Sequence, residues 1–157
     1  MEMLNKKTIL VTGGAGFIGS HLIERLLVES QHALICLDNY NDYYDPALKR
    51  KNVTSFEHNP RVTMVEADFC QREAMQALFR EHQFSHIVHL GAYAGVRPSI
   101  ERPLVYQKAN VEGTLVLLEA AREFPVERFL LVSSSTVYGQ NAPAPFRENG
   151  PLGVPLS

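Results

Sequence analysis

The chain has 157 residues, of which 45% are hydrophobic and 20% are charged, and its formal net charge is −2. This is the composition of a soluble globular domain with a core of its own. The chain contains no basic block of the kind that binds nucleic acid and no apolar run long enough to cross a membrane. Neither nucleic acid nor a membrane is therefore an expected partner.

The first residues, 1–7, are polar and lead directly into an apolar run, which is not the pattern of a signal peptide. The two cysteines, Cys36 and Cys70, lie far apart and lack the spacing of metal ligands. We therefore expect free buried thiols in a reducing compartment, the cytoplasm, and no metal site.

Apolar runs and helical spacings alternate along the chain. Runs typical of strands lie at residues 8–11, 33–37, 62–65, 87–90 and 128–132, and helical spacings lie at 17–29, 46–53, 71–81 and 103–123. From Gly139 onward the chain is rich in Pro, Gly and Asn, which predicts a loop. The alternation predicts one α/β domain over residues 1–157, built on a Rossmann-like doubly wound parallel sheet.

The first predicted strand turns into the first helix through a glycine-rich loop, residues 12–19. Gly13 would allow the tight turn, Gly16 would let a pyrophosphate approach the backbone, and Gly19 would let the helix pack against the sheet. The backbone N–H groups and the helix dipole would then face an anion. The loop predicts a dinucleotide site.

An acid, Asp38, ends the second predicted strand. A carboxylate there accepts both hydroxyls of an adenosine ribose and repels a 2′-phosphate, which favours NAD over NADP. No arginine follows Asp38 directly to accept a phosphate. The alternative is that Asp38 caps the next turn.

Further candidates follow the third and fourth strands. Asp68 could accept from the adenine amino group, with Phe69 beside the ring, or it could be the N-cap of the helix from Gln71. The small residues 91–95 would let a cofactor lie across the strand ends. Arg97, Ser99 and Arg102 would lie on a loop facing the same crevice, where Arg97 pairs with a carboxylate or diphosphate or is simply solvated.

The fifth strand leads into a run of hydroxyl side chains, residues 133–136. Ligands bind at this edge of such sheets, so these hydroxyls would face a substrate. They lack the flanking glycines of a serine-hydrolase nucleophile. The alternative is that they satisfy backbone groups of the loop.

With these residues identified, the chain resembles the extended short-chain dehydrogenase/reductase family, and within it the NAD-dependent nucleotide-sugar epimerases and dehydratases. The motifs that carry the resemblance are residues 12–19, Asp38-Asn39, Asp68, residues 89–92, residues 110–114 and residues 133–139. A narrower likeness, to the UDP-glucuronate 4-epimerase branch, lies in residues 38–45, Leu48-Lys49 and residues 94–99. Gly91 departs from the alanine that the family more often has.

The resemblance implies the N-terminal part of an enzyme that oxidises a UDP-sugar transiently at C4 with bound NAD. The cofactor-binding residues it implies, together with those above, are Gly13, Gly16, Phe17, Ile18, Gly19, Asp38, Asn39, Asp68, Phe69, Leu90, Gly91, Ala92 and Ala94. The implied substrate-binding residues are Arg97, Ser99, Ser134, Ser135 and Thr136, with Ser134 holding the sugar hydroxyl in the catalytic step.

The family's catalytic base is a tyrosine followed four residues later by a lysine, and none of the six tyrosines here has a lysine in that place. We therefore expect the chain to stop before the Tyr-x-x-x-Lys helix and the C-terminal substrate-binding domain, and to catalyse nothing by itself. A 4,6-dehydratase or reductase, or a non-catalytic NAD-binding module, remains the alternative. The resemblance also implies a homodimeric parent whose interface is formed by the helix at 103–123 and the helix after the missing tyrosine. The apolar residues of the predicted helix at 103–123 include Val111, Leu115, Leu118 and Ala121.

Overall fold

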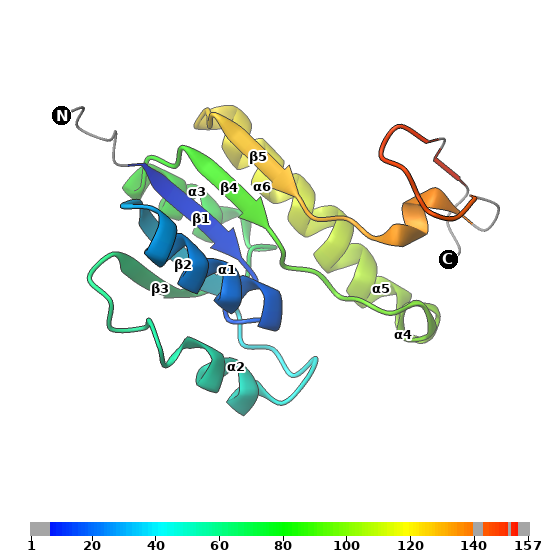
Figure 1. The fold of residues 1–157 in the computed structure, drawn as a ribbon, viewed down its shortest axis with the longest axis horizontal. Helices are drawn as coiled ribbons and strands as arrows, with labels where there is room; N and C mark the ends of the chain where they lie inside the picture. The colour runs from blue at the N-terminus through cyan, green and yellow to red at the C-terminus, as the bar shows by residue number, and fades with distance from the viewer. Residues whose placement is uncertain (1–6, 140–142, 151, 154–157) are drawn as a thin grey trace.

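The computed structural model describes residues 7–139, 143–150 and 152–153, and its centre is a parallel sheet of five strands (Figure 1). The strand order is β3-β2-β1-β4-β5, and every neighbouring pair is parallel. The strands are β1 (Thr8–Thr12), β2 (Ala33–Asp38), β3 (Val62–Glu66), β4 (His86–His89) and β5 (Arg128–Leu131). The predicted Rossmann-like fold is confirmed.

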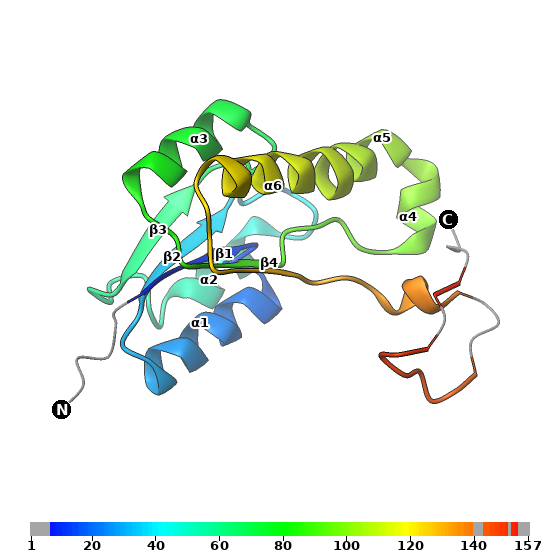
Figure 2. The same cartoon turned by 90° about the horizontal axis from the view of Figure 1, so that it is seen from above.

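Helices cover both faces of the sheet (Figure 2). One face carries α1 (Phe17–Glu29) and α2 (Pro46–Val53), and the other carries α3 (Arg72–Glu81) and α6 (Thr114–Glu123). Alternate residues of β1 belong to different cores, because Leu10 packs with α3 and α6 whereas Ile9 and Val11 pack with α1. This double coverage explains why the strands read as continuous apolar runs.

The predicted helix at 103–123 is interrupted. It consists of α5 (Pro103–Tyr106), the π-helical segment η1 (Gln107–Gly113) and α6. Short π segments inside α-helices occur frequently at functional sites. Here the Asn110 side chain accepts from the Tyr93 N–H at 2.8 Å and donates to the Tyr93 carbonyl at 2.9 Å, which ties the segment to the loop after β4.

Two short helical elements were not predicted. Residues expected in a loop form α4 (Val96–Glu101), which carries Arg97 and Ser99, and residues after β5 form the 3₁₀ turn η2 (Ser135–Tyr138). Side chains hydrogen-bond to nearby backbone groups in both elements. Ser99 Oγ donates to the Val96 carbonyl at 2.6 Å in α4, and Ser134 Oγ accepts from the Thr136 N–H at 3.3 Å at the start of η2. Such short elements lack the periodicity that identifies longer helices.

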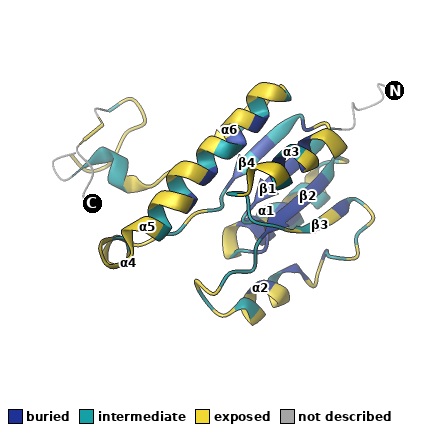
Figure 3. Ribbon diagram, turned by 180° about the vertical axis from the view of Figure 1, so that it is seen from behind, coloured by how far each residue is buried: buried dark blue, intermediate teal, exposed yellow. Residues whose placement is uncertain are grey.

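The apolar stripe of the long helix faces outward. Leu104, Val111 and Leu115 are all more than half exposed and Leu118 is 44% exposed, whereas Leu117 and Ala120 are buried in the core against the sheet. Figure 3 shows this exposed side along α5 and α6. None of the helices that the structure describes is both long and apolar enough to cross a membrane.

A buried histidine links three elements of the core. His89 Nδ1 lies 2.6 Å from Thr12 Oγ1 on β1, and its Nε2 lies 3.1 Å from Thr114 Oγ1 on α6. Burial lowers the pKa of His89 from 6.5 to about 4. The imidazole is therefore neutral in the folded protein at neutral pH.

This burial predicts that acid destabilises the protein through His89. Between pH 6.5 and 4 the unfolded chain binds a proton at His89 that the folded chain does not, so the free energy of unfolding falls as the pH falls, by about 3 kcal/mol in all. Urea unfolding of His89→Gln should show a weaker loss over this range. His58→Ala is the control, because that side chain is 92% exposed. An unchanged pH profile for His89→Gln would refute the assignment.

Candidate functional site

The glycine-rich loop joins the carboxyl end of β1 to the start of α1, at the point where the strand order reverses between β1 and β4. Gly13 has φ +67°, a backbone conformation that favours glycine, and the Gly16 N–H donates to the Gly13 carbonyl at 3.0 Å. Gly16 is the N-cap of α1 and has no side chain to cap it. The first N–H groups of α1 are thus available to an anion.

The glycine roles differ in one respect from the prediction. A Cβ on Gly19 would lie 2.2 Å from the Gly13 carbonyl oxygen, so Gly19 packs on the loop itself rather than on the sheet. The close contact with a strand belongs to Gly14, where a Cβ would lie 2.6 Å from Cys36 Sγ on β2. The absence of a side chain at Gly14 thus lets the loop pack on the sheet, and its absence at Gly19 lets α1 pack on the loop.

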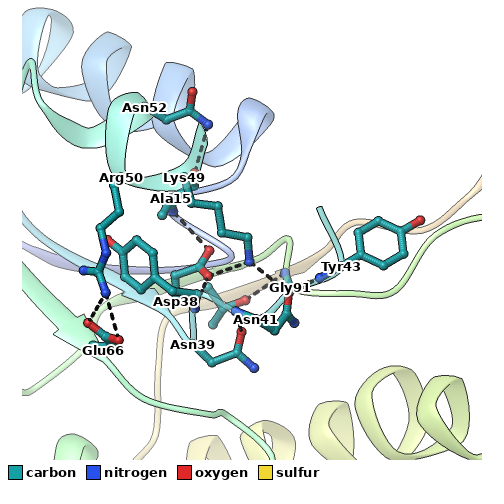
Figure 4. A network of polar contacts seen from close by, with 12 residues as sticks. Ala15, Asp38, Asn39, Asn41, Tyr43, Lys49, Arg50, Asn52, Glu66 and Gly91 are labelled. Carbon is teal, nitrogen blue, oxygen red and sulfur yellow. Dashed lines mark hydrogen bonds and ion pairs between the residues drawn. The ribbon is translucent and has the colours of Figure 1, made fainter. Parts of the chain in front are cut away.

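Asp38 is the centre of a buried polar network (Figure 4). Its Oδ2 accepts from the Ala15 N–H of the glycine loop at 3.2 Å, and its Oδ1 accepts from the Tyr40 N–H at 2.9 Å. Both interpretations of Asp38 are therefore compatible: the carboxylate caps the next turn and also faces the loop. A carboxylate has room for about four hydrogen bonds. Asp38 already accepts three, the third from Lys49 Nζ, so it retains capacity for one ligand hydroxyl rather than for both hydroxyls of a ribose.

A cation that the sequence did not predict lies beside Asp38. Lys49 Nζ lies 2.9 Å from Asp38 Oδ1, and the two side chains are only 8% and 4% exposed. The same Nζ donates to Asn41 Oδ1 at 3.2 Å and lies 5.4 Å from the centre of the Tyr44 ring. The sequence contained one indication that Lys49 is buried. Lys49 stands four residues before Val53, so the two side chains lie on the same face of α2, and Val53 is in the core.

Phe69 lies between two glycines. A Cβ on Gly91 would lie 2.6 Å from Phe69 Cε1, and a Cβ on Gly113 would lie 2.4 Å from Phe69 Cε2. The glycine at 91 is thus required by the ring. Asp68 Oδ1 accepts from the Cys70 N–H at 2.9 Å, so it caps the turn before α3, while Gln71 occupies the N-cap position.

These segments enclose a cleft of about 290 Å³. The predicted cofactor residues that line it are Gly13, Gly16, Asp38, Asn39, Asp68, Phe69, Leu90, Gly91 and Ala92. Four others, Phe17, Ile18, Gly19 and Ala94, do not line it. Phe17 and Ile18 are 71% and 63% exposed, and Ala94 faces the cleft's edge through its carbonyl. The half-buried Cys70 also lines the cleft, in contrast to the buried Cys36.

Tyrosine side chains connect two of the segments that form the cleft. The hydroxyls of Tyr43 and Tyr106 both donate to the Ala94 carbonyl, at 2.6 and 2.5 Å, and the Tyr43 and Tyr93 rings are 5.2 Å apart. The segment after β2 is thereby fastened to the segment after β4. Sequence reasoning did not predict this contact, because it joins residues about fifty positions apart.

The hydroxyl group of Tyr44 indicates that the cleft can accommodate a ligand that accepts a hydrogen bond. Its hydroxyl is buried and has no hydrogen-bond partner among the residues that the structure describes. The same oxygen would lie 3.7 Å from a Cβ on Gly16, the residue at which a pyrophosphate is predicted to approach the backbone. A buried hydroxyl without a partner is costly, so a ligand that accepts from it would be stabilised. Desolvation raises the pKa of Tyr44, which keeps it a donor.

The predicted substrate residues lie apart from this cleft. Arg97 and Ser99 are on α4, and Ser134, Ser135 and Thr136 are at η2. Ser134 Oγ accepts from the Thr136 N–H and from Thr136 Oγ1, at 3.3 and 3.1 Å. Ser134 therefore satisfies a backbone N–H group of the loop, as the alternative interpretation predicts. The hydroxyl proton of Ser134 remains available to donate to a ligand.

A family model described as GDP-mannose 4,6 dehydratase matches residues 10–157. UDP-glucuronate 4-epimerase 4 of Arabidopsis thaliana is 40% identical over 154 residues, which are 98% of this chain and 35% of that protein. UDP-glucuronate 4-epimerase of Thermodesulfobacterium geofontis is 39% identical over 94% of this chain and 45% of the relative.

A solved structure supports the same grouping. The crystal structure of UDP-glucuronic acid 4-epimerase from Bacillus cereus, in complex with UDP-glucuronic acid and NAD, matches with a TM-score of 0.85 and 34% identity. The match covers 96% of this chain and 46% of that one. The chain thus spans less than half the length of these relatives.

Proposed function

The chain belongs to the GDP-mannose 4,6 dehydratase family, and we propose that it is the NAD-binding part of a nucleotide-sugar epimerase that acts on UDP-glucuronate. The observation that carries the proposal is the meeting of the glycine loop with Asp38, joined by the bond from the Ala15 N–H. This arrangement offers N–H donors for a pyrophosphate and a carboxylate for a ribose at one cleft.

The residues of the chain would divide the binding between them. Gly13, Gly16 and the start of α1 would hold the pyrophosphate, and Asp38 would accept from the adenosine ribose while Lys49 keeps its carboxylate in place. When bound, NAD supplies the acceptor for a hydride. Ser134 would donate its free proton to the sugar oxygen, with its orientation fixed by Thr136.

We propose that the 157-residue chain binds NAD but does not convert UDP-glucuronate, since no tyrosine in it is followed four residues later by lysine. Calorimetric titration should detect one NAD site, and NMR of UDP-glucuronate incubated with chain and NAD should show no UDP-galacturonate. Absence of NAD binding would refute the site, and measurable epimerisation would refute the need for that tyrosine–lysine pair.

A 4,6-dehydratase is the second candidate, favoured by the description of the family model. Dehydratases of this family usually place Asp-Glu directly after the hydroxyl residue that corresponds to Ser134, the N-cap of η2, whereas Ser135-Thr136 follows Ser134 here. This difference favours the epimerase. The product formed by a longer protein that contains this chain would decide between them. An epimerase would convert UDP-glucuronate into its C4 epimer, whereas a 4,6-dehydratase would eliminate the C6 hydroxyl of a nucleotide-bound hexose and yield a 4-keto-6-deoxy sugar.

Removal of the Tyr44 hydroxyl should weaken NAD binding. Tyr44→Phe keeps the ring beside Lys49 and deletes the buried donor near Gly16, so we expect NAD affinity to fall about tenfold, the effect of one hydrogen bond to a charged group. Calorimetry measures the change. Tyr138→Phe, at η2, is the control that should leave NAD binding unaltered. Equal affinity for Tyr44→Phe and the unchanged chain would contradict this role.

We also propose that the parent enzyme is a homodimer and acts in the cytoplasm, where it would supply UDP-sugars for polysaccharide biosynthesis. The exposed stripe of Leu104, Val111, Leu115 and Leu118 supports an interface along α5 and α6. The free thiols of Cys36 and Cys70 support a reducing compartment. Light scattering of the full-length parent, with and without Leu115→Glu, tests the interface.

A further inference from the structure

We propose that Lys49 and Arg50 form a latent site for the 2′-phosphate of NADP, which the carboxylates of Asp38 and Glu66 neutralise in the natural chain. The inference rests on the proposed function, because it assumes that Asp38 faces the adenosine ribose. It goes beyond that function by identifying which charges set the preference for NAD and how the preference is reversed.

The two basic residues follow one another on α2 and face the same short segment after β2 (Figure 4). Lys49 Nζ lies 2.9 Å from Asp38 Oδ1, and the Arg50 guanidinium lies 3.9 Å over the centre of the Tyr40 ring. Arginine and lysine side chains at this end of the second strand are what a 2′-phosphate requires. No arginine follows Asp38 directly in the sequence, but α2 brings Arg50, twelve positions downstream, over the ring of Tyr40.

Each cation is paired with one acid. Arg50 Nη2 donates to both carboxylate oxygens of Glu66, at 3.0 and 2.9 Å, and Lys49 pairs with Asp38. Asp38 and Glu66 are register partners on the neighbouring strands β2 and β3. Each cation therefore has its own counter-ion at this edge of the sheet, and of the four residues Lys49 and Asp38 line the cleft. The two carboxylates therefore offset the attraction of the two cations for a phosphate dianion.

Loss of the carboxylate charge would leave the cations without counter-ions. With Asp38→Asn, Lys49 keeps hydrogen-bond acceptors, including Asn41 Oδ1 at 3.2 Å, but its buried ammonium lacks an opposite charge. With Glu66→Gln, the exposed Arg50 is released as well. A 2′-phosphate would then replace both acids with a single dianion, for which a paired lysine and arginine are suited.

The test compares the affinities for NAD and NADP by calorimetry on the 157-residue chain and its variants. We expect Asp38→Asn/Glu66→Gln to raise the NADP-to-NAD affinity ratio about 100-fold, about tenfold for each carboxylate removed, and high salt to reduce the gain. Adding Lys49→Met to the double variant should remove the part of the gain due to Lys49. Glu29→Gln, which removes an exposed carboxylate at the far end of α1, is the matched control.

The outcomes separate the two proposals. If the natural chain binds neither NAD nor 5′-AMP, the proposed function fails. If the double variant still binds NAD but its NADP-to-NAD ratio is unchanged, the latent site is wrong while the proposed function stands. If Asp38→Asn prevents folding, the single variant Glu66→Gln is used for the test. Glu66 is exposed, so this substitution should leave the fold intact. An unchanged ratio in that variant would overturn the inference equally.

Discussion

Gly19→Ala should lower the free energy of unfolding by about 3 kcal/mol and abolish NAD binding. An alanine Cβ at position 19 would lie 2.2 Å from the Gly13 carbonyl oxygen and 2.8 Å from the Gly14 Cα. Both are backbone atoms of the glycine loop, so no side-chain rotation relieves the contact. Either α1 moves away from the loop or the loop loses the turn at Gly13, and in both cases the anion site is lost.

Gly16→Ala is the matched variant for this prediction. Its Cβ would lie 3.1 Å from the Gly13 carbonyl oxygen and 3.7 Å from the Tyr44 hydroxyl, a tight but tolerable position. We expect Gly16→Ala to keep most of the stability and to weaken NAD binding, since the added methyl occupies the approach of the pyrophosphate. Urea unfolding and calorimetry separate the two effects. A Gly19→Ala variant as stable as the natural chain would contradict the packing described here.

Lys49→Met should destabilise the fold by about 4 kcal/mol at neutral pH, because it leaves the Asp38 carboxylate buried without its counter-ion. The two side chains are 8% and 4% exposed, so water compensates little for the lost partner. Urea unfolding measures the loss. Lys51→Met, an exposed position on the same helix, should change the free energy of unfolding by less than about 0.5 kcal/mol.

A double variant identifies the cause of that loss. Asp38→Asn/Lys49→Met removes both charges, and we expect it to be more stable than Lys49→Met alone, since replacing both members of a buried pair costs less than removing one. A double variant that is less stable than Lys49→Met would show that the charge pair is not the source of the destabilisation.

Local patterns were sufficient to predict the sheet and its glycine loop. The five strands begin and end within about one residue of the predictions, because each is an apolar run bounded by turn residues. The positions of Gly13, Gly16 and Asp38 in one cleft follow from the strand–loop–helix pattern. These features depend on neighbours in the chain, and neighbours are visible in a single sequence.

The contacts that complete the site depend on residues distant in the chain. Lys49 reaches Asp38 from α2, and Tyr43 meets Ala94 across 51 positions. Phe69 fits only because Gly91 and Gly113 both lack a side chain. No periodicity encodes such pairings. The short helix α4 was also not predicted. It has only six residues, and one of them is Pro98, a residue that usually interrupts a helix.

The substrate side of the site remains a prediction. Arg97, Ser99, Ser134, Ser135 and Thr136 are not gathered around the cleft that Gly13 and Asp38 line. Their roles rest on the likeness to epimerases and on the position of η2 after β5. The relatives that suggest these roles are about twice as long as this chain or longer.

The most direct test of the central claim is an NMR titration of the isotopically labelled chain with NAD. We predict that the amide signals of the glycine loop, Asp38 and Leu90–Ala92 shift together with a single affinity, and that Asp38→Ala weakens the response. Shifts confined to the separate pocket at Tyr138 and Phe146, or no shifts at millimolar NAD, would contradict the assignment of this cleft as a dinucleotide site.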